Sequence, residues 1–277
     1  MAGQDKRASR TRPHVTQPSE PVFNVPAAVV GLVALLVLVH AFGGWLLGEG
    51  WIIWELAFIP GRFGSYFGVD IVALAEAGLR LDEEGADQLL ALARAIAADG
   101  ESKPWTFLTY AFLHGSWPHV LLNCVWLTAF GTAVARRFGT VRFLLLMALA
   151  AVGGSLGHLA TQPGSVLPMV GASAAVSGAM AAALRFAFQP GAPLGIYRLD
   201  ERTAYLLPAL PLRDVLAERR ALTFLIIWFV LNLASGLAAP ELGLVDSSIA
   251  WQAHIGGFLA GLLAFPLLDP VPRGPRS

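Results

Sequence analysis

The sequence predicts an all-α polytopic membrane protein with six transmembrane helices and a long outer loop between the first two. Of its 277 residues, 56% are hydrophobic and only 14% are charged, whereas about a quarter of the residues in a soluble domain are charged. Six apolar segments approach the length of about 20 residues that a membrane-spanning helix needs. They cover 27–47, 119–135, 141–160, 170–189, 221–239 and 249–268.

The distribution of Lys and Arg predicts the orientation of these segments. Positive residues gather in the N-terminal tail, in the loops after the second and fourth segments, and in the C-terminal tail. The opposite side has four, all in one loop rich in Asp and Glu: Arg62, Arg80, Arg94 and Lys103. Because cytoplasmic loops carry the excess of Lys and Arg, we expect both termini in the cytoplasm. The expected organisation is a disordered tail (1–26), a six-helix membrane domain (27–268) and a short second tail (269–277).

The outer loop, 48–118, is the largest expected extramembrane piece. Residues 51–63 are apolar and aromatic but are interrupted by charge and proline, so we expect them to lie in the membrane interface. Trp51 and Trp54 would then sit at the level of the lipid headgroups. Over 71–97 apolar residues recur at helical spacing, bounded by Gly85 and Gly100, which predicts one amphipathic helix on the membrane surface.

Four polar side chains fall inside the predicted spans at a shared depth. His119 and Asn123 stand four residues apart and therefore project from one face of the second helix. Ser173 and His254 lie in the first two turns of the fourth and sixth segments. The second, fourth and sixth segments all run inward, so all four side chains lie toward the outer leaflet. A hydroxyl, an imidazole and hydrogen-bond donors at one level are the groups that acyl transfer requires.

Small residues predict that the fourth and sixth helices pack closely. The stretch GASAAVSGAMA begins at Gly171, and Gly257 and Gly261 follow His254 along one helical face. Small residues allow transmembrane helices to approach each other, and this contact would bring His254 toward the serine. Gly256 points to a different face, so we expect its substitution to be milder than that of Gly261.

Each of these features has a structural explanation as well. Serine in a transmembrane helix usually bonds to its own backbone, a histidine can serve packing, and glycine pairs are a common packing device. A non-catalytic membrane scaffold and a small-molecule transporter are therefore alternatives. A transporter usually places Asp, Glu or Lys at mid-membrane, and none is found there in the predicted spans, apart from Arg185 near the cytoplasmic end of the fourth.

Several other chemistries are disfavoured by composition. The chain has no HExxH motif and no Asp inside a predicted span, so zinc and aspartyl proteolysis are not expected, nor is any metal or cofactor. The formal net charge is zero, which does not indicate a nucleic-acid partner. The single cysteine, Cys124, cannot form an internal disulfide.

Three motifs together resemble the rhomboid family of intramembrane serine proteases in its bacterial six-helix form. They are GASA at 171–174, HGSWPHVLLN at 114–123 and AHIGGFLAG at 253–261, and the resemblance covers about 27–268. It implies that Ser173 is the nucleophile and that His254 is its general base, without a third acidic residue. It further implies that His119, Asn123 and the Ser173 amide form an oxyanion hole. His114 and Gly171 would support the site.

The resemblance also implies substrates and a location. The substrates would be transmembrane proteins cut near their outer ends, within the lipid bilayer of a bacterial inner membrane. A catalytically inactive rhomboid-like scaffold or substrate-escort protein is the alternative, and the oligomeric state is left open.

Three positions depart from the family pattern. Ala174 replaces a common glycine, and Trp105-Thr106 replaces a common Trp-Arg, which leaves open how the outer loop is anchored. Ser177 stands where an aromatic residue often stacks on the catalytic histidine. The ring of His254 must therefore be held in another way.

Overall fold

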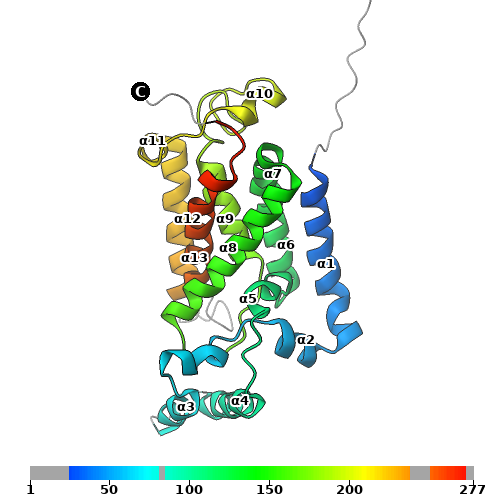
Figure 1. The fold of residues 1–277 in the computed structure, drawn as a ribbon, viewed down its shortest axis with the longest axis vertical. Coiled ribbons are helices and arrows are strands. Elements are labelled where there is room, and N and C mark those ends of the chain that lie inside the picture. The colour runs from blue at the N-terminus through cyan, green and yellow to red at the C-terminus, as the bar shows by residue number, and fades with distance from the viewer. Residues whose placement is uncertain (1–24, 81–84, 238–249, 273–277) are drawn as a thin grey trace, which may run out of the picture.

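The computed structural model describes residues 25–80, 85–237 and 250–272. Within these ranges every regular element is helical, in agreement with the all-α prediction. The first and last described residues lie at the same end of the molecule (Figure 1). The predicted tails fall mostly on 1–24 and 273–277, outside the described residues.

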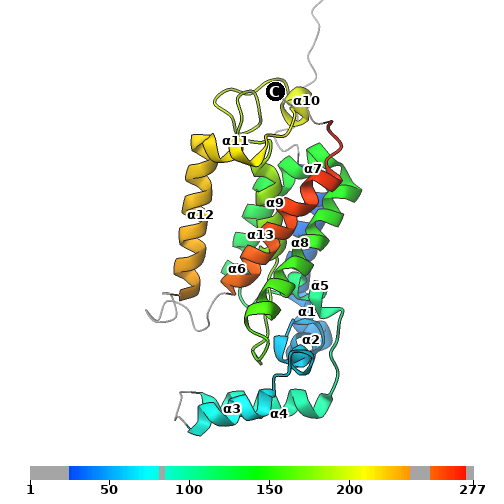
Figure 2. The same cartoon turned by 60° about the vertical axis from the view of Figure 1, so that its left-hand side comes forward.

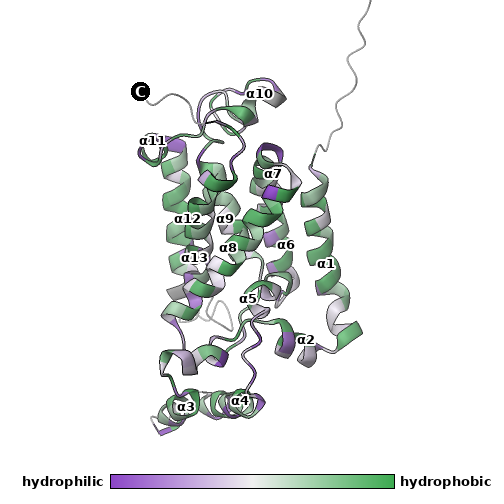
Figure 3. Ribbon diagram, viewed as in Figure 1, coloured by the Kyte–Doolittle hydropathy of each residue, from purple (hydrophilic) through white to green (hydrophobic). Residues whose placement is uncertain are grey.

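Among the described residues, four helical runs are long and apolar enough to cross a membrane. They are α1 (Ala27–Leu47), the run Trp117–Phe138, α8 (Thr140–Thr161) and α13 (Trp251–Leu268). The second run consists of α6 (Trp117–Trp126), the π-helical turn η3 (Leu127–Gly131) and α7 (Thr132–Phe138). Helices of this length extend about 30 Å, the thickness of the hydrocarbon core. Hydrophobic residues predominate along them (Figure 3).

The fourth predicted segment forms a shorter helix than expected. The helix α9 covers Ser173–Leu184, only 12 residues, or about 18 Å. Gly171 has a φ of +126°, which lies outside the helical region, so the helix can begin only after it. Beyond Leu184 the chain continues in turns. The prediction of a span-length helix over 170–189 is therefore wrong in its bounds.

The fifth predicted segment forms α12 (Arg219–Leu237). Its expected end at 239 and the expected start of the sixth segment at 249 lie outside the described residues. The helix runs beside α13 (Figure 2). It contacts α13 through Trp228, whose ring stacks on Phe258 with centroids 4.9 Å apart.

The segment 48–118 contains several short helices where the sequence predicts one interfacial segment and one amphipathic helix. They are α2 (Glu49–Leu56), η1 (Pro60–Phe67), α3 (Ile71–Arg80), α4 (Ala86–Asp99), α5 (Thr106–Thr109) and η2 (Tyr110–Phe112). The single helix expected over 71–97 is wrong in its extent, because α3 and α4 are separate helices that pack together. The expected bounds Gly85 and Gly100 are the residues that flank α4. Ile71, Ala93 and Ile96 bury their side chains in one cluster with Ile59 and Val166, and this cluster joins the helix pair to the rest of the protein.

Buried charges and an indole anchor the segment 48–118. The Arg62 guanidinium lies 4.5 Å from the centre of the Trp54 ring and 3.7 Å from Asp99. Burial lowers the pKa of Arg62, and the nearby carboxylates oppose that shift. The Trp105 indole donates to the Glu55 carbonyl at 2.8 Å, and the Thr106 hydroxyl donates to the backbone at 2.6 Å. These two bonds provide local anchoring at the Trp105-Thr106 departure.

Three helices, α8, α9 and α13, form the centre of the bundle through small residues. A Cβ on Gly257 would lie 2.1 Å from the Ala174 carbonyl oxygen, and one on Gly261 would lie 2.4 Å from Gly178. Gly256 faces α8, where a Cβ would lie 2.3 Å from the Gly153 oxygen. The expectation that Gly256 is a less constrained position is therefore wrong. Gly256 lies on a different face of α13 from Gly257, and that face is packed just as tightly against α8.

The end of the molecule away from α3 and α4 carries α10 (Glu201–Leu206) and α11 (Leu212–Ala217) (Figure 1). The Arg137 side chain links the chain segments that meet at this end. Its Nε and Nη2 donate to the two carboxylate oxygens of Asp269, each at 2.8 Å. Its Nη1 donates to the carbonyls of Tyr205 and Leu207. A bidentate pair with further carbonyl partners is a strong way to satisfy a buried guanidinium.

Candidate active site

Ser173 and His254 meet in the centre of the bundle although 81 residues separate them. Ser173 is the first residue of α9, and His254 lies in the first turn of α13. The Ser173 Oγ is 2.7 Å from the His254 Nε2. Because Gly257 and Gly261 let α13 approach the backbone of α9, no side chain separates the hydroxyl from the ring.

The bonding of Ser173 differs from that of Ser177 in the same helix. The Ser177 hydroxyl donates to the Ser173 carbonyl at 2.7 Å, which is the usual behaviour of a helical serine. The Ser173 side chain instead contacts an imidazole from another helix. As the first residue of α9, Ser173 also carries one of the backbone N–H groups that have no partner within the helix.

His119 borders the same space as the Ser173 hydroxyl. A Cβ built on Gly171 would lie 2.9 Å from the His119 Nε2 and 3.7 Å from the Ser173 Oγ. Gly171 is held there by a hydrogen bond from its N–H to the Tyr110 carbonyl at 3.1 Å. The absence of a side chain at Gly171 therefore leaves room between the imidazole of His119 and the hydroxyl. Its positive φ also favours glycine.

Asn123 is buried one helical turn after His119. Its Nδ2 donates to the His119 carbonyl at 2.9 Å. An amide carries two N–H groups, so this bond leaves a second donor for another acceptor. The bond also fixes the orientation of the amide on the inner face of α6.

His114 lies directly before α6 and is bonded to the loop that precedes α9. Its Nε2 accepts from the Ala172 N–H at 3.4 Å, and its carbonyl accepts from the His40 Nδ1 at 3.1 Å. Burial lowers the pKa of His114 to about 3, with smaller contributions from His119 and His40. His114 is therefore neutral at pH 7 and connects α1, α6 and the start of α9.

Comparison with known proteins assigns the family. The family model described as Rhomboid domain matches residues 101–269, which is more than half of the chain. The chain belongs to the rhomboid family. Together with its apolar helices, this membership makes it a multi-pass membrane protein.

Individual relatives agree with this family. The chain is 31% identical over 170 residues to Rhomboid protease GluP of Bacillus subtilis, covering 61% of this chain and 27% of that protein. It is 29% identical over 220 residues to RHOMBOID-like protein 5 of Arabidopsis thaliana, covering 78% and 57%. It is 25% identical over 159 residues to Rhomboid protease GlpG of Yersinia pestis, covering 57% and 46%. The chain thus spans between 27% and 57% of the length of these relatives.

Two residues near the candidate active site were not predicted from the sequence. The His254 Nδ1 is hydrogen-bonded to the Oδ1 of Asn232, which lies on α12. His40, on α1, bonds to the His114 carbonyl and packs edge-on against Trp117 at 4.7 Å. Both are polar residues inside long apolar runs, a pattern that usually indicates a partner on another helix. That signal could have identified them.

The described residues contain no group of three or more His, Cys, Asp or Glu side chains that could hold a metal ion. The groups that do converge are a hydroxyl, an imidazole in contact with it, and neighbouring hydrogen-bond donors. This arrangement can transfer a proton from the hydroxyl to the ring and can carry out nucleophilic attack.

Proposed function

We propose that this rhomboid-family chain is an intramembrane serine endopeptidase that hydrolyses peptide bonds in or near the transmembrane segments of other membrane proteins. The observation that carries the proposal is the 2.7 Å contact between the Ser173 Oγ and the His254 Nε2. Relatives named as rhomboid proteases support the same reaction class.

The proposed reaction begins at Ser173. Its Oγ attacks the carbonyl carbon of the substrate while its proton passes to the Nε2 of His254. The resulting oxyanion accepts hydrogen bonds from the Ser173 N–H and from the side chains of His119 and Asn123. The protonated His254 then gives the proton to the leaving amine, and the carbon–nitrogen bond breaks. Water repeats the sequence on the acyl-enzyme, which releases the acid product and restores the serine.

The membrane arrangement is part of the proposal. We place α9 and α12 with the four longer runs in a six-helix domain over 27–268, with the loop 48–118 outside and both termini in the cytoplasm. The excess of Lys and Arg at the end of the molecule that carries α10 and α11 supports this orientation. The proposed location is the bacterial cell membrane, and the proposed partners are transmembrane substrates and the lipid bilayer.

The test compares the purified protein with its Ser173→Ala and His254→Ala variants in detergent. One readout is covalent labelling by a fluorescent fluorophosphonate, and the other is cleavage of a panel of fluorescent single-span proteins. We expect each substitution to abolish both, because a nucleophile and its base act as a unit. Wild-type protein that neither labels nor cleaves would instead favour a catalytically inactive scaffold or escort protein. Equal cleavage by wild type and Ser173→Ala would refute the serine mechanism.

A further inference from the structure

The imidazole of His254 is bonded on both sides. Its Nε2 faces Ser173, and its Nδ1 is hydrogen-bonded to the Oδ1 of Asn232 on the neighbouring helix α12. Asn232 is buried, with 7% of its surface exposed. Its Nδ2 donates to the Trp251 carbonyl at 3.4 Å. A carbonyl can only accept, so this second bond orients the amide with its nitrogen toward Trp251 and its oxygen toward the ring.

This orientation determines where the ring carries its proton. The Asn232 oxygen can only accept a hydrogen bond, so the His254 Nδ1 must carry the hydrogen. A neutral imidazole has one N–H, and its other nitrogen therefore presents a lone pair. The lone pair lies on Nε2, the atom that contacts the Ser173 hydroxyl. This is the tautomer that can accept the serine proton.

We infer that Asn232 is a positioning residue that holds His254 in the tautomer and orientation required of the general base. The inference rests on the proposed function. It also explains how the ring is held although Ser177 stands where an aromatic partner was expected: the support comes from α12 instead of α9. A neutral amide achieves this without placing a second charge among apolar helices.

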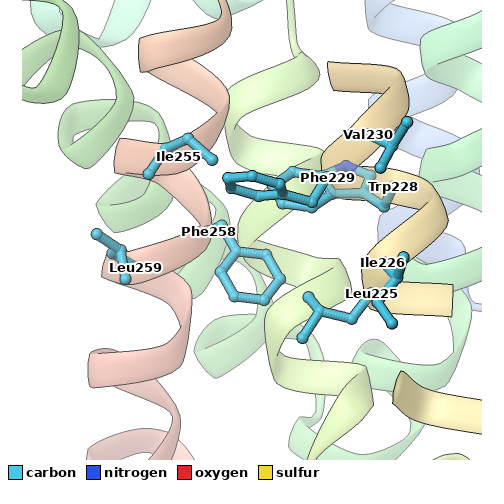
Figure 4. Close-up of a pocket in the computed structure, with 8 residues that line it drawn as sticks. All are labelled: Leu225, Ile226, Trp228, Phe229, Val230, Ile255, Phe258 and Leu259. Atoms are coloured by element: carbon cyan, nitrogen blue, oxygen red, sulfur yellow. The ribbon is translucent and has the colours of Figure 1, made fainter. Parts of the chain in front are cut away.

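The surroundings of the amide make the bond important. One turn away along both helices, Trp228 and Phe258 stack at 4.9 Å. These two rings, with Ile255, line an apolar groove between α12 and α13 (Figure 4). If the Asn232 oxygen is removed, the Nδ1 hydrogen of His254 faces an apolar contact and loses its partner. The ring is then free to adopt the other tautomer or to rotate away from Ser173.

The first experiment separates hydrogen bonding from packing. Asn232→Leu keeps a side chain branched at Cγ and removes the acceptor, and Asn232→Ala removes the acceptor and the packing beyond Cβ. The control is Leu231→Ala, because Leu231 is 60% exposed on the same helix. The probe is a fluorescent fluorophosphonate, and the readout is its second-order labelling rate. We expect both Asn232 variants to label roughly 10- to 100-fold more slowly, as for other residues that orient a functional histidine, and the control to label at the wild-type rate.

The second experiment restores the acceptor with a charge. Asn232→Asp keeps an oxygen that can bond to the His254 Nδ1, so labelling should exceed that of Asn232→Leu. A carboxylate beside the imidazole also favours the protonated ring, which should move the acid limb of the labelling-rate profile to higher pH. His119 is the other titratable group that acts on His254, and it is unchanged in this variant. If the side chain at position 232 filled space without bonding to the His254 ring, Asn232→Asp would leave this limb in place.

The outcomes distinguish this inference from the proposed function. If Ser173→Ala abolishes labelling but Asn232→Leu labels at the wild-type rate, the positioning role is wrong and the serine mechanism stands. An acid limb that is identical in Asn232→Asp and wild type would also overturn the role, even if Asn232→Leu failed to fold. If wild-type protein does not label at all, the proposed function itself fails.

Discussion

The contact between α9 and α13 leads to the sharpest prediction, for the substitution Gly257→Ala. The added Cβ would lie 2.1 Å from the Ala174 oxygen and 2.9 Å from its Cα, whereas ordinary van der Waals contact begins at 3.4 Å. The obstructing atoms are backbone, so no side-chain rotation relieves the overlap. The two helices must separate by about 1 Å at this point, since repulsion rises steeply inside the contact distance.

The separation acts directly on the reacting pair. Ala174 follows Ser173 on one helix, and Gly257 lies one turn beyond His254 on the other. A shift of about 1 Å would lengthen the 2.7 Å contact between Oγ and Nε2 beyond hydrogen-bonding distance. A misplacement of about 1 Å can cost on the order of 100-fold in rate, and overpacking typically costs about 1–3 kcal/mol of stability.

The assay measures labelling and unfolding on the same preparation. Labelling by the fluorophosphonate reports the Ser173 geometry. Thermal unfolding can be followed with a thiol-reactive dye, because Cys124 is the single cysteine and is buried. The matched control is Gly31→Ala in α1, where a Cβ would meet nothing within 4 Å. We expect Gly257→Ala to label about 100-fold more slowly and to unfold at a lower temperature, and the control to match wild type.

One result would refute this reasoning. If Gly257→Ala labels within about twofold of wild type and unfolds at the same temperature, the helices tolerate the extra atom. The close backbone contact would then not be what brings His254 to Ser173.

The remaining predictions use the same two measurements. Gly256→Ala should lower the unfolding temperature about as much as Gly257→Ala, because its Cβ would lie 2.3 Å from the Gly153 oxygen; an unfolding temperature like that of Gly31→Ala would contradict this. Asn123→Ala should slow labelling by roughly 100- to 1000-fold yet leave it measurable, because other oxyanion donors remain; complete loss would mean that Asn123 holds the site together instead. The third prediction concerns pH, because burial lowers the pKa of His114 from 6.5 to about 3. Below about pH 6.5 the imidazole of His114 is therefore protonated in the unfolded chain but stays neutral in the folded protein. Stability should therefore fall as the pH drops from 6.5 toward 4, and less steeply in His114→Gln, in which the neighbouring titratable groups His119 and His40 are unchanged. Equal slopes would argue against the burial of a neutral imidazole.

Much of the fold and of the candidate site follows from the sequence alone. The length of the apolar runs and the distribution of Lys and Arg predict membrane helices and their direction, because both depend only on the properties of the bilayer as a solvent. That direction is enough to put Ser173 and His254 at one depth. Helical spacing is enough to put His119 and Asn123 on one face. These properties are local, or they are imposed by the membrane.

The tertiary structure decides which faces meet and what lies between them. Helical spacing separates Gly256 from Gly257, but only packing reveals that Gly256 faces α8 while Gly257 faces α9. Asn232 is one amide in an apolar run, and its bond to His254 exists only because α12 lies beside α13. The late start and early end of α9 likewise depend on the backbone at Gly171 and on the turns after Leu184. Contacts between helices in a membrane depend on side-chain shape and on polar partners from distant parts of the chain, and no periodicity in one segment contains that information.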